Sequence, residues 1–329
     1  MERVNLTDSF GRVVRDLRIS VTDRCNFRCT YCMPEEGMQW LPRADVLTFE
    51  EIERVARLFV QHFGVDGIRL TGGEPTVRAH VSLLVQKLAA LGVDLAMTTN
   101  GATFRHHAHE LREAGLRRVN ISLDTLDRDR FIQMTRRDEL ANVLDGIEAA
   151  KEAGFAPVKI NAVVERGVND GEIIDLARFG RERGVEVRFI EFMPLDASGH
   201  WLHDKVVGQD EIVAVLSAEF PLEPVPARGA APADTWRYRD GAGIVGVIPT
   251  VTKPFCGDCD RVRLTADGKF RTCLFATDEF DLMSLLRNGA TDQQLADEIV
   301  RAVGLKWSGH QIGQVTFVKP KRTMSQIGG

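Results

Sequence analysis

The sequence has no long apolar run and no excess of positive charge. No uninterrupted hydrophobic stretch among its 329 residues approaches the roughly 18 residues that a membrane-spanning helix requires. No apolar segment follows residues 1–5, so we expect no signal peptide and a cytoplasmic protein. The net charge of −5 argues against general binding to nucleic acids or acidic membranes, although an acidic protein can still gather arginines in a small site.

Cysteine is scarce, and its distribution is informative. The cysteines form two triplets, which are Cys25, Cys29 and Cys32, and Cys256, Cys259 and Cys273. A disulfide framework would spread cysteines through a small secreted chain, whereas clustered cysteines in a larger chain favour metal binding.

Apolar strand-like runs alternate with helical periodicity over the first 190 residues. The expected strands cover residues 17–21, 67–71, 95–99, 119–123, 158–164 and 187–192. Helices are expected near residues 48–63, 81–91, 106–114, 130–153 and 172–183, the first with Thr48 and Glu51 as a capping box. This order predicts parallel strands covered by helices, and both a six-unit partial barrel and a doubly wound sheet satisfy it. In either fold, ligands bind at the carboxyl ends of the strands.

The pattern changes after about residue 197. Residues 220–234 are rich in proline and alanine and are expected to be irregular, and the second cysteine triplet follows them. We therefore divide the chain into residues 1–196 and residues 197–329.

The first triplet has the spacing Cys25-x3-Cys29-x2-Cys32, at the end of the first expected strand. Three thiolates on one loop can hold an iron–sulfur cluster and leave one iron open to a substrate or cofactor. A zinc site completed from elsewhere and free thiols are the alternatives. An electron carrier would normally close all four irons, so three cysteines favour catalysis.

Residues 25–32, with Tyr31 before the last cysteine, resemble the signature of the radical S-adenosylmethionine enzymes. Residues 72–75 (Gly-Gly-Glu-Pro) resemble the element with which that superfamily binds the amino group of S-adenosylmethionine. The resemblance implies a four-iron cluster on Cys25, Cys29 and Cys32 that cleaves S-adenosylmethionine reductively to a 5′-deoxyadenosyl radical.

The second triplet has the spacing Cys256-x2-Cys259-x13-Cys273 and surrounds two alternating arginines. On an extended segment, Arg261 and Arg263 project to one face, which suits a phosphate group. A zinc site completed by a residue such as His310, with two surface arginines beside it, is the simpler alternative.

The whole pattern resembles the GTP 3′,8-cyclase family, which begins molybdenum-cofactor biosynthesis. The resemblance rests on both triplets, on residues 17–24, 68–75, 98–101, 120–124 and 189–194, and on the terminal Gly-Gly. It implies a partial (β/α)6 TIM-like barrel whose open side is covered by a C-terminal extension that carries a second four-iron cluster. It also implies a lyase that converts GTP to (8S)-3′,8-cyclo-7,8-dihydroguanosine 5′-triphosphate, with formation of 5′-deoxyadenosine and methionine.

The resemblance also implies the site residues and partners. S-adenosylmethionine would contact Tyr31, Gly73, Ser122 and Met193, and GTP would contact Arg18, Arg69, Thr98, Lys159, Arg261, Val262 and Arg263. The second cluster would use Cys256, Cys259 and Cys273, and the tail residues Gly328 and Gly329 would reach the reaction, although a terminal Gly-Gly is ordinarily a flexible end. A flavodoxin- or ferredoxin-type reductant and a downstream cyclic pyranopterin monophosphate synthase are implied, and monomer and homodimer both stay open.

The residue types suit this function, since four arginines and one lysine offset the charge of a triphosphate. One departure is Gly67, where members of the family commonly carry a basic residue. A radical enzyme acting on a peptide and a non-catalytic iron–sulfur or zinc protein are the competing hypotheses. His106, His107 and His109 lack cysteine or carboxylate partners nearby in sequence and are expected to lie at a solvated helix end.

Overall fold

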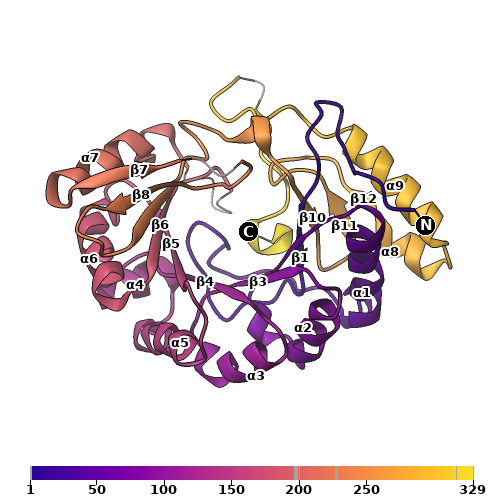
Figure 1. The fold of residues 1–329 in the computed structure, drawn as a ribbon, viewed down its shortest axis with the longest axis horizontal. Coiled ribbons are helices and arrows are strands. Elements are labelled where there is room, and N and C mark those ends of the chain that lie inside the picture. Colours follow the sequence, from indigo (N-terminus) through magenta and orange to yellow (C-terminus); the bar gives the residue numbers. More distant parts are fainter. Residues whose placement is uncertain (1, 196–198, 200, 227–228, 316, 329) are drawn as a thin grey trace.

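The computed structural model describes residues 2–195, 199, 201–226, 229–315 and 317–328. Six parallel strands form the centre of the molecule and curve around a common interior (Figure 1). They are β1 (Asp16–Ser20), β2 (Gly67–Thr71), β3 (Asp94–Thr99), β4 (Arg118–Ser122), β5 (Lys159–Val164) and β6 (Glu186–Glu191). Each strand pairs with the next one along the chain, without the reversal of order that a doubly wound sheet requires. The partial barrel is therefore confirmed.

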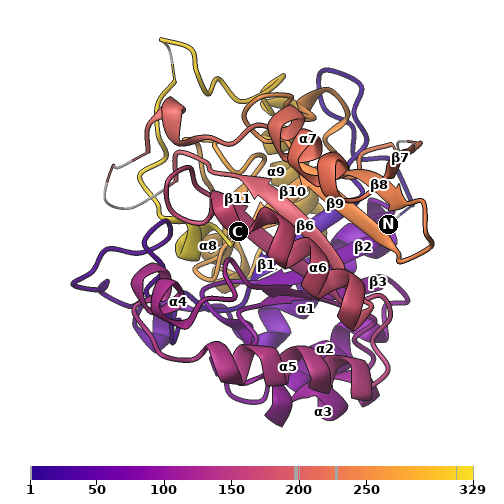
Figure 2. The same ribbon diagram turned by 90° about the vertical axis from the view of Figure 1, so that its left-hand side faces the viewer.

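Helices cover the outside of these strands (Figures 1 and 2). They are α1 (Phe49–Arg57), α2 (Val81–Ala89), α3 (Ala108–Glu113), α4 (Arg128–Thr135), α5 (Leu140–Glu152) and α6 (Ile173–Arg183). The Thr48 side chain accepts from the Glu51 amide, and the Glu51 side chain accepts from the Thr48 amide, so the expected capping box is present. No helix in the described residues is both long and apolar enough to cross a bilayer.

The C-terminal part of the chain lengthens the sheet at both edges. β10 (Arg261–Leu264) lies parallel to β1 and is followed by β11 (Lys269–Arg271) and β12 (Phe280–Asp281). At the other edge, β9 (Ile244–Ile248) lies parallel to β6 and is followed by β8 (Asp234–Tyr238) and β7 (Leu222–Val225). The remaining helices are α7 (Gln209–Glu219), α8 (Leu282–Arg287), α9 (Asp292–Gly304) and α10 (Met324–Ile327).

One sequence expectation was wrong. Residues 220–234 are not wholly irregular, because they contain β7. This strand is the last one of the sheet, and an edge strand tolerates Pro224 in its ladder.

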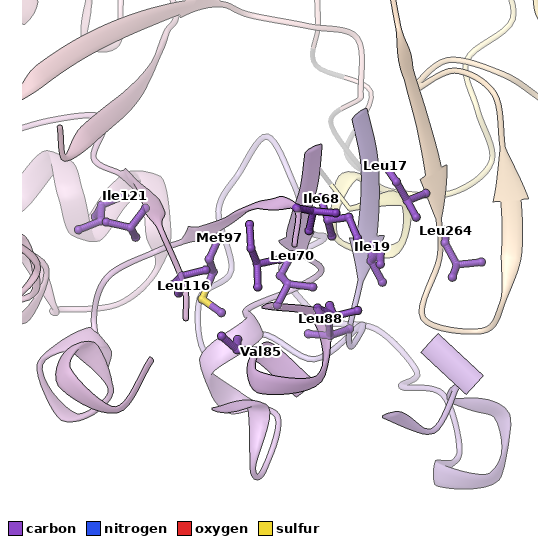
Figure 3. Packing of buried hydrophobic residues seen from close by; sticks show 14 of the residues in the cluster. Leu17, Ile19, Ile68, Leu70, Val85, Leu88, Met97, Leu116, Ile121 and Leu264 are labelled. Atoms are coloured by element: carbon purple, nitrogen blue, oxygen red, sulfur yellow. The ribbon is translucent and has the colours of Figure 1, made fainter. Parts of the chain in front are cut away.

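Alternation along the strands separates an apolar outer face from a polar inner one. Leu17, Ile19, Ile68, Leu70 and Met97 point away from the barrel interior and belong to one buried cluster with Val85 and Leu88 of α2 (Figure 3). Because successive residues of a strand face opposite ways, the intervening residues, such as Arg18 and Arg69, face the interior. The same pattern that builds the core therefore places charge inside the barrel.

Candidate active site inside the barrel

Both cysteine triplets line one cavity of about 620 Å³ in the barrel interior. Its walls include, from the residues expected at the site, Arg18, Cys25, Cys29, Tyr31, Cys32, Arg69, Gly73, Thr98, Ser122, Lys159, Met193, Cys256, Cys259, Arg261, Arg263 and Cys273. Segments that are far apart in sequence thus meet around one space, as the position of the motifs at strand ends predicts.

The end of α4 holds the first cysteine loop. The backbone amides of Arg28 and Thr30 donate to the carbonyls of Thr135 and Met134 at 3.0 and 2.9 Å. The guanidinium of Arg136 donates to the carbonyl of Arg28 at 2.9 Å. These bonds fix the backbone between the cysteines, so the positions of the thiols are set by the barrel.

The ends of β2 and β3 hold the same loop from the other side. Asn100 Nδ2 donates to Asn26 Oδ1 at 2.7 Å and lies 3.8 Å from Cys25 Sγ. The buried carboxylate of Glu74 in turn accepts from the backbone amide of Asn100 at 2.6 Å and from Thr99 Oγ1 at 2.7 Å. Glu74 therefore orients the residue that touches the cysteine loop.

Gly72 and Gly73 make room for the backbone that leads into the first cysteine loop. A Cβ on Gly73 would lie 2.2 Å from the carbonyl oxygen of Arg24, and one on Gly72 would lie 2.4 Å from that of Thr22. The Gly73 amide donates to the Thr22 carbonyl at 2.8 Å. The close approach that two glycines permit is thus made by the protein's own chain, while Gly73 also borders the cavity.

Burial raises the pKa of each thiol in the first triplet. The pKa of Cys25 rises to about 11, with a further contribution from Glu74, and that of Cys32 rises to about 12. The pKa of Cys29 is also raised well above its ordinary value by burial and then by Cys32 and Asp124. A bound cation would compensate the charge of these thiolates, because metal binding displaces thiol protons.

Tyr31 is tied to the end of β4. Its hydroxyl donates to Asp124 Oδ2 at 2.6 Å, and the Val163 amide donates to Asp124 Oδ1 at 2.8 Å. Burial raises the pKa of Asp124 to about 6, against the opposing effect of these hydrogen bonds. The ring of Tyr31 is therefore held at the cavity wall beside the first triplet.

A row of arginines crosses three neighbouring strands. The register pairs Arg18 of β1 with Arg263 of β10 and with Arg69 of β2. In the described residues, Arg18 Nε, Arg69 Nε and Nη1, and Arg261 Nη2 are buried and have no hydrogen-bond partner. Burial and then the charge of Arg18 lower the pKa of Arg69 to about 9. Adjacent like charges with unpaired donors are costly and call for an anion between them.

The cavity is also lined by two arginines that were not predicted from the sequence. Arg118 Nε donates to Asp94 Oδ1 at 2.9 Å, and Arg188 Nε donates to Glu186 Oε1 at 2.6 Å. Burial and then the charge of Arg188 lower the pKa of Lys159 to about 8. Strand alternation would have found both, since Arg118 shares a face with Ser122 and Arg188 alternates with apolar residues that pack outward.

Gly67 lies on the cavity side of β2, opposite Asp16 of β1 and Asp94 of β3. A Cβ at this position would make only ordinary contacts, the nearest at 3.6 Å from the carbonyl oxygen of Arg15. A β-carbon therefore fits at this position, and Arg118 and Arg188 bring further cations to the same cavity.

The second cysteine triplet lies in a basic environment. Lys306 Nζ donates to the carbonyls of Cys259 and Arg261, each at 2.9 Å, and lies 3.9 Å from Cys259 Sγ. Burial raises the pKa of Cys259, but the charges of Arg261 and Lys306 outweigh it and leave the pKa below its ordinary value. The second loop therefore favours a thiolate at Cys259, whereas burial raises the pKa of Cys256 as it does those of the first triplet.

The C-terminal tail enters the barrel (Figure 1). The carbonyl of Gly328 accepts from the Arg263 guanidinium, and Gly328 has φ +80°. A Cβ there would lie 2.4 Å from Thr71 Oγ1, so only glycine fits. Gly329 lies outside the described residues. The side chain of Val262 packs in the hydrophobic core, so a contact from Val262 to a ligand would come from its backbone.

The six cysteines are free, and the donor set fits iron–sulfur clusters. No group of three or more His, Cys, Asp or Glu side chains in the described residues is gathered at the distances of a single metal ion. In a cubane cluster each thiolate binds a different iron, and each loop offers three thiols to the cavity. His310 Nε2 is buried and has no hydrogen-bond partner among the described residues, and its ring lies 5.1 Å from that of Phe275.

Comparison with known families divides the chain in two. Residues 19–180 match the Radical SAM superfamily, and residues 185–312 match the family described as Molybdenum Cofactor Synthesis C.

Curated relatives match almost the whole chain. The GTP 3′,8-cyclase of Streptomyces coelicolor is 49% identical over 98% of this chain and 96% of its own length. The enzyme of that name from Rhodopirellula baltica is 48% identical over 99% of this chain and 92% of its own length.

Solved structures share the fold at low sequence identity. Streptococcus suis SuiB bound to its precursor peptide SuiA has a TM-score of 0.59 at 15% identity, and the match covers 83% of this chain and 64% of SuiB. SuiB bound to S-adenosylmethionine has a TM-score of 0.56 at 14% identity, over 86% of this chain and 68% of SuiB. At this identity the likeness bears on the fold alone.

Proposed function

This chain belongs to the GTP 3′,8-cyclase family of radical S-adenosylmethionine enzymes, and we propose that it cyclises GTP at the cavity between its two cysteine loops. Membership implies one four-iron cluster and S-adenosylmethionine. The product is 3′,8-cyclo-7,8-dihydro-GTP, the first intermediate of molybdenum-cofactor biosynthesis, with 5′-deoxyadenosine and methionine as co-products.

The observation that carries the proposal is the unpaired arginine row in the cavity shared by both triplets. Among the described residues, Arg18, Arg69 and Arg261 offer buried donors without partners, and Arg18 lies opposite Arg69 and Arg263 in the strand register. A triphosphate supplies the anion and the acceptors that these donors lack. Lys159 and Arg263 extend the same set, and Thr98 offers a neutral hydrogen-bonding group.

The first loop would hold the radical-generating half of the site. Cys25, Cys29 and Cys32 would bind a four-iron cluster, which when bound with S-adenosylmethionine supplies the electron and the 5′-deoxyadenosyl radical that takes hydrogen from C3′ of GTP. S-adenosylmethionine would contact Tyr31, Gly73, Ser122 and Met193, all of which line the cavity. Asp124 orients Tyr31 for this role through its hydrogen bond.

The second loop would hold the substrate base. We propose that Cys256, Cys259 and Cys273 would hold a second four-iron cluster, which would supply a binding site for the guanine, with Arg261, Arg263 and the Val262 backbone as further contacts. Orientation of C3′ toward C8 and exclusion of water from the radical are then the work of the protein. The tail residue Gly328, bound to Arg263, supports a role for the terminal Gly-Gly at this site.

The remaining parts of the proposal concern organisation and partners. Residues 1–196 would form the radical barrel and residues 197–329 the extension with the second cluster. A flavodoxin- or ferredoxin-type protein would deliver electrons in the cytoplasm, and a cyclic pyranopterin monophosphate synthase would take the product. Residues of a single chain line the cavity, which is compatible with both a monomer and a homodimer.

The test uses protein purified and reconstituted without oxygen, together with a variant in which the three C-terminal cysteines are alanine. We expect about eight irons in the first protein and about four in the second, as two four-iron clusters require. With dithionite, S-adenosylmethionine and GTP, only the first protein should form the cyclised nucleotide. About four irons in both proteins would remove the second cluster, and absence of 5′-deoxyadenosine under every condition would overturn the radical chemistry.

A further inference from the structure

The N-terminal segment before β1 reaches the second cysteine loop. Residues 1–18 lie outside the two matched regions, residues 19–180 and 185–312. Within this segment, residues 6–14 form a small hairpin, in which the Val14 amide donates to the Leu6 carbonyl at 2.8 Å and Thr7 pairs with Val13. Figure 1 shows this indigo segment running beside the orange and yellow C-terminal part of the chain.

Arg12 is the side chain that makes the connection. It is 9% exposed, and its Nε donates to the buried carboxylate of Asp8 at 2.6 Å. Asp8 also accepts from the backbone amides of Phe10 and Arg12, at 2.9 and 3.0 Å. The hairpin and the ion pair thus fix the direction of the guanidinium before it meets the rest of the chain.

The other two guanidinium nitrogens donate to backbone carbonyls of Cys256 and of residues 307–308. Arg12 Nη1 donates to the carbonyl of Cys256 at 2.6 Å and to that of Ser308 at 2.8 Å. Nη2 donates to the carbonyl of Trp307 at 2.5 Å. One buried cation therefore joins the backbone of a cysteine to a segment that follows it by about fifty residues.

That segment forms the wall against which Cys256 packs. A Cβ on Gly309 would lie 3.1 Å from Cys256 Cβ and 3.6 Å from Cys256 Sγ. Since Arg12 binds the two residues before Gly309, it holds both Cys256 and the surface that the thiol touches. Lys306 holds the backbone of Cys259 in a similar way, because its Nζ donates to the Cys259 carbonyl at 2.9 Å.

We propose that Arg12, anchored by Asp8, is a positioning residue of the C-terminal metal centre and fixes Cys256 as a cluster ligand. The proposal rests on the second cluster of the proposed function. Charge-assisted hydrogen bonds to backbone carbonyls are strong, and partners behind metal ligands set both affinity and geometry. Much of the loop around Cys256 is exposed, so bonds from outside the loop are needed to hold it.

The test compares full-length protein, reconstituted without oxygen, with Arg12→Met, Arg12→Lys and Asp8→Asn. The matched control is Arg15→Gln, because Arg15 lies in the same segment but donates to the Gly64 carbonyl at 2.8 Å, away from the cysteines. Iron content and the rate of iron release to a chelator are measured for each protein. For Arg12→Met we expect about four irons, or release of the second four at least about tenfold faster than in the wild type.

The effect should be confined to the second cysteine loop, which distinguishes a positioning role of Arg12 from a general loss of protein stability. Arg12→Met should keep the iron of the first loop and its formation of 5′-deoxyadenosine without GTP. Arg12→Lys, which keeps the charge but loses the fork of donors, should retain more iron yet bind GTP less tightly and show a smaller GTP-induced change in the electron paramagnetic resonance spectrum. Arg15→Gln should match the wild type in all of these measurements.

Three results would overturn the proposal in distinguishable ways. Wild-type protein with about four irons would remove the second cluster itself, and with it both the proposed function and this inference. About eight irons with unchanged release rates in Arg12→Met would overturn the inference alone. If Arg12→Met does not fold, Arg12→Lys and Asp8→Asn decide: equal loss of iron from both loops would make the pair a general folding element.

Discussion

The two cysteine loops line one cavity in opposite electrostatic surroundings. Near the first loop lie the buried carboxyl groups of Glu74 and Asp124, and burial raises the pKa of all three thiols. The second loop is bordered by Arg261 and Lys306, whose charges hold the pKa of Cys259 below its ordinary value, although burial still raises the pKa of Cys256. The supports come from different parts of the chain, since Asn100 and Arg136 of the barrel hold the first loop whereas Arg12 and Lys306 hold the second.

This difference shows how one cavity can sort two ligands. S-adenosylmethionine carries a positive sulfonium group, and GTP carries a triphosphate. A carboxyl-rich end favours the first and an arginine-rich end favours the second, because each charge lowers the cost of burying its opposite. Under the proposed function, the polarity of the cavity would therefore place the two ligands at its two ends.

Removal of a whole cysteine triplet should have the largest effect, and the two triplets should differ in which product is lost. Replacing Cys25, Cys29 and Cys32 by alanine is expected to abolish 5′-deoxyadenosine, because no thiolates then hold the radical-generating cluster. Replacing Cys256, Cys259 and Cys273 should leave 5′-deoxyadenosine formation but abolish the cyclised product. Chromatography of both products checks this. The same loss pattern for both variants would contradict a division of labour between the loops.

Arg69→Met should weaken the basic end and leave the acidic end intact. Loss of charged donors to the triphosphate is expected to cost about 2 kcal/mol, or roughly 30-fold in the Kd for GTP. The thermal midpoint of the ligand-free protein should not fall, because the variant removes a buried cation that repels Arg18. Calorimetric titration and thermal unfolding measure the two effects. An unchanged Kd would exclude Arg69 from the GTP site.

Asn100→Ala should weaken the first loop alone. It removes the amide that donates to Asn26 at 2.7 Å and approaches Cys25. The expected loss is about 1.4 kcal/mol, or about tenfold in the rate of 5′-deoxyadenosine formation, with the iron of the second loop retained. The exposed Asn142→Ala is the matched control. Equal loss of iron from both loops would mean that Asn100 acts on the whole barrel.

The basic end should also be sensitive to pH through Lys159. Its pKa is lowered to about 8, so the free protein loses this cation as the pH rises through 8, while bound triphosphate favours the charged form. The affinity for GTP is therefore expected to fall several-fold between about pH 7 and pH 9. Lys159→Arg keeps its charge and should flatten this dependence. Equal pH profiles of Kd in the two proteins would assign the titration to another group.

Gly67→Lys should strengthen the basic end by the smallest amount. The position faces the cavity, and a Cβ there meets its nearest atom at 3.6 Å. A partly solvated lysine is expected to improve GTP binding only a few-fold, or less than about 1 kcal/mol. Gly67→Ala controls for the loss of glycine. Equal affinities in the two variants would indicate that Arg118 and Arg188 already supply the charge.

The strand positions were predictable because burial imposes a period on the sequence. Strands predicted at 17–21 and 67–71 appear at Asp16–Ser20 and Gly67–Thr71, since apolar residues alternate there on the face that meets the helices. The family resemblance named Arg18 and Arg69, and the same alternation explains why both face the interior. This alternation was not applied to Arg118 and Arg188, which line the cavity for the same reason.

Other features depended on neighbours that are distant in sequence. Gly72 and Gly73 indicated a close approach, but the approaching atoms belong to Thr22 and Arg24, about fifty residues earlier. Residues 222–225 carry little strand signal and become β7 because β8 offers them a partner at the edge of the sheet.

The sequence by itself determined the local chemistry of this protein: the two cysteine spacings, the alternating arginines, and the helices and strands that carry them. These follow from short-range periodicity and from the ligand chemistry of side chains. The tertiary structure decided the order of the strands, the shared cavity, and the contact of Arg12 with Cys256 across 244 positions of the chain. Such juxtapositions arise when the sheet curves and buries its outer face, a long-range packing event that no local pattern encodes.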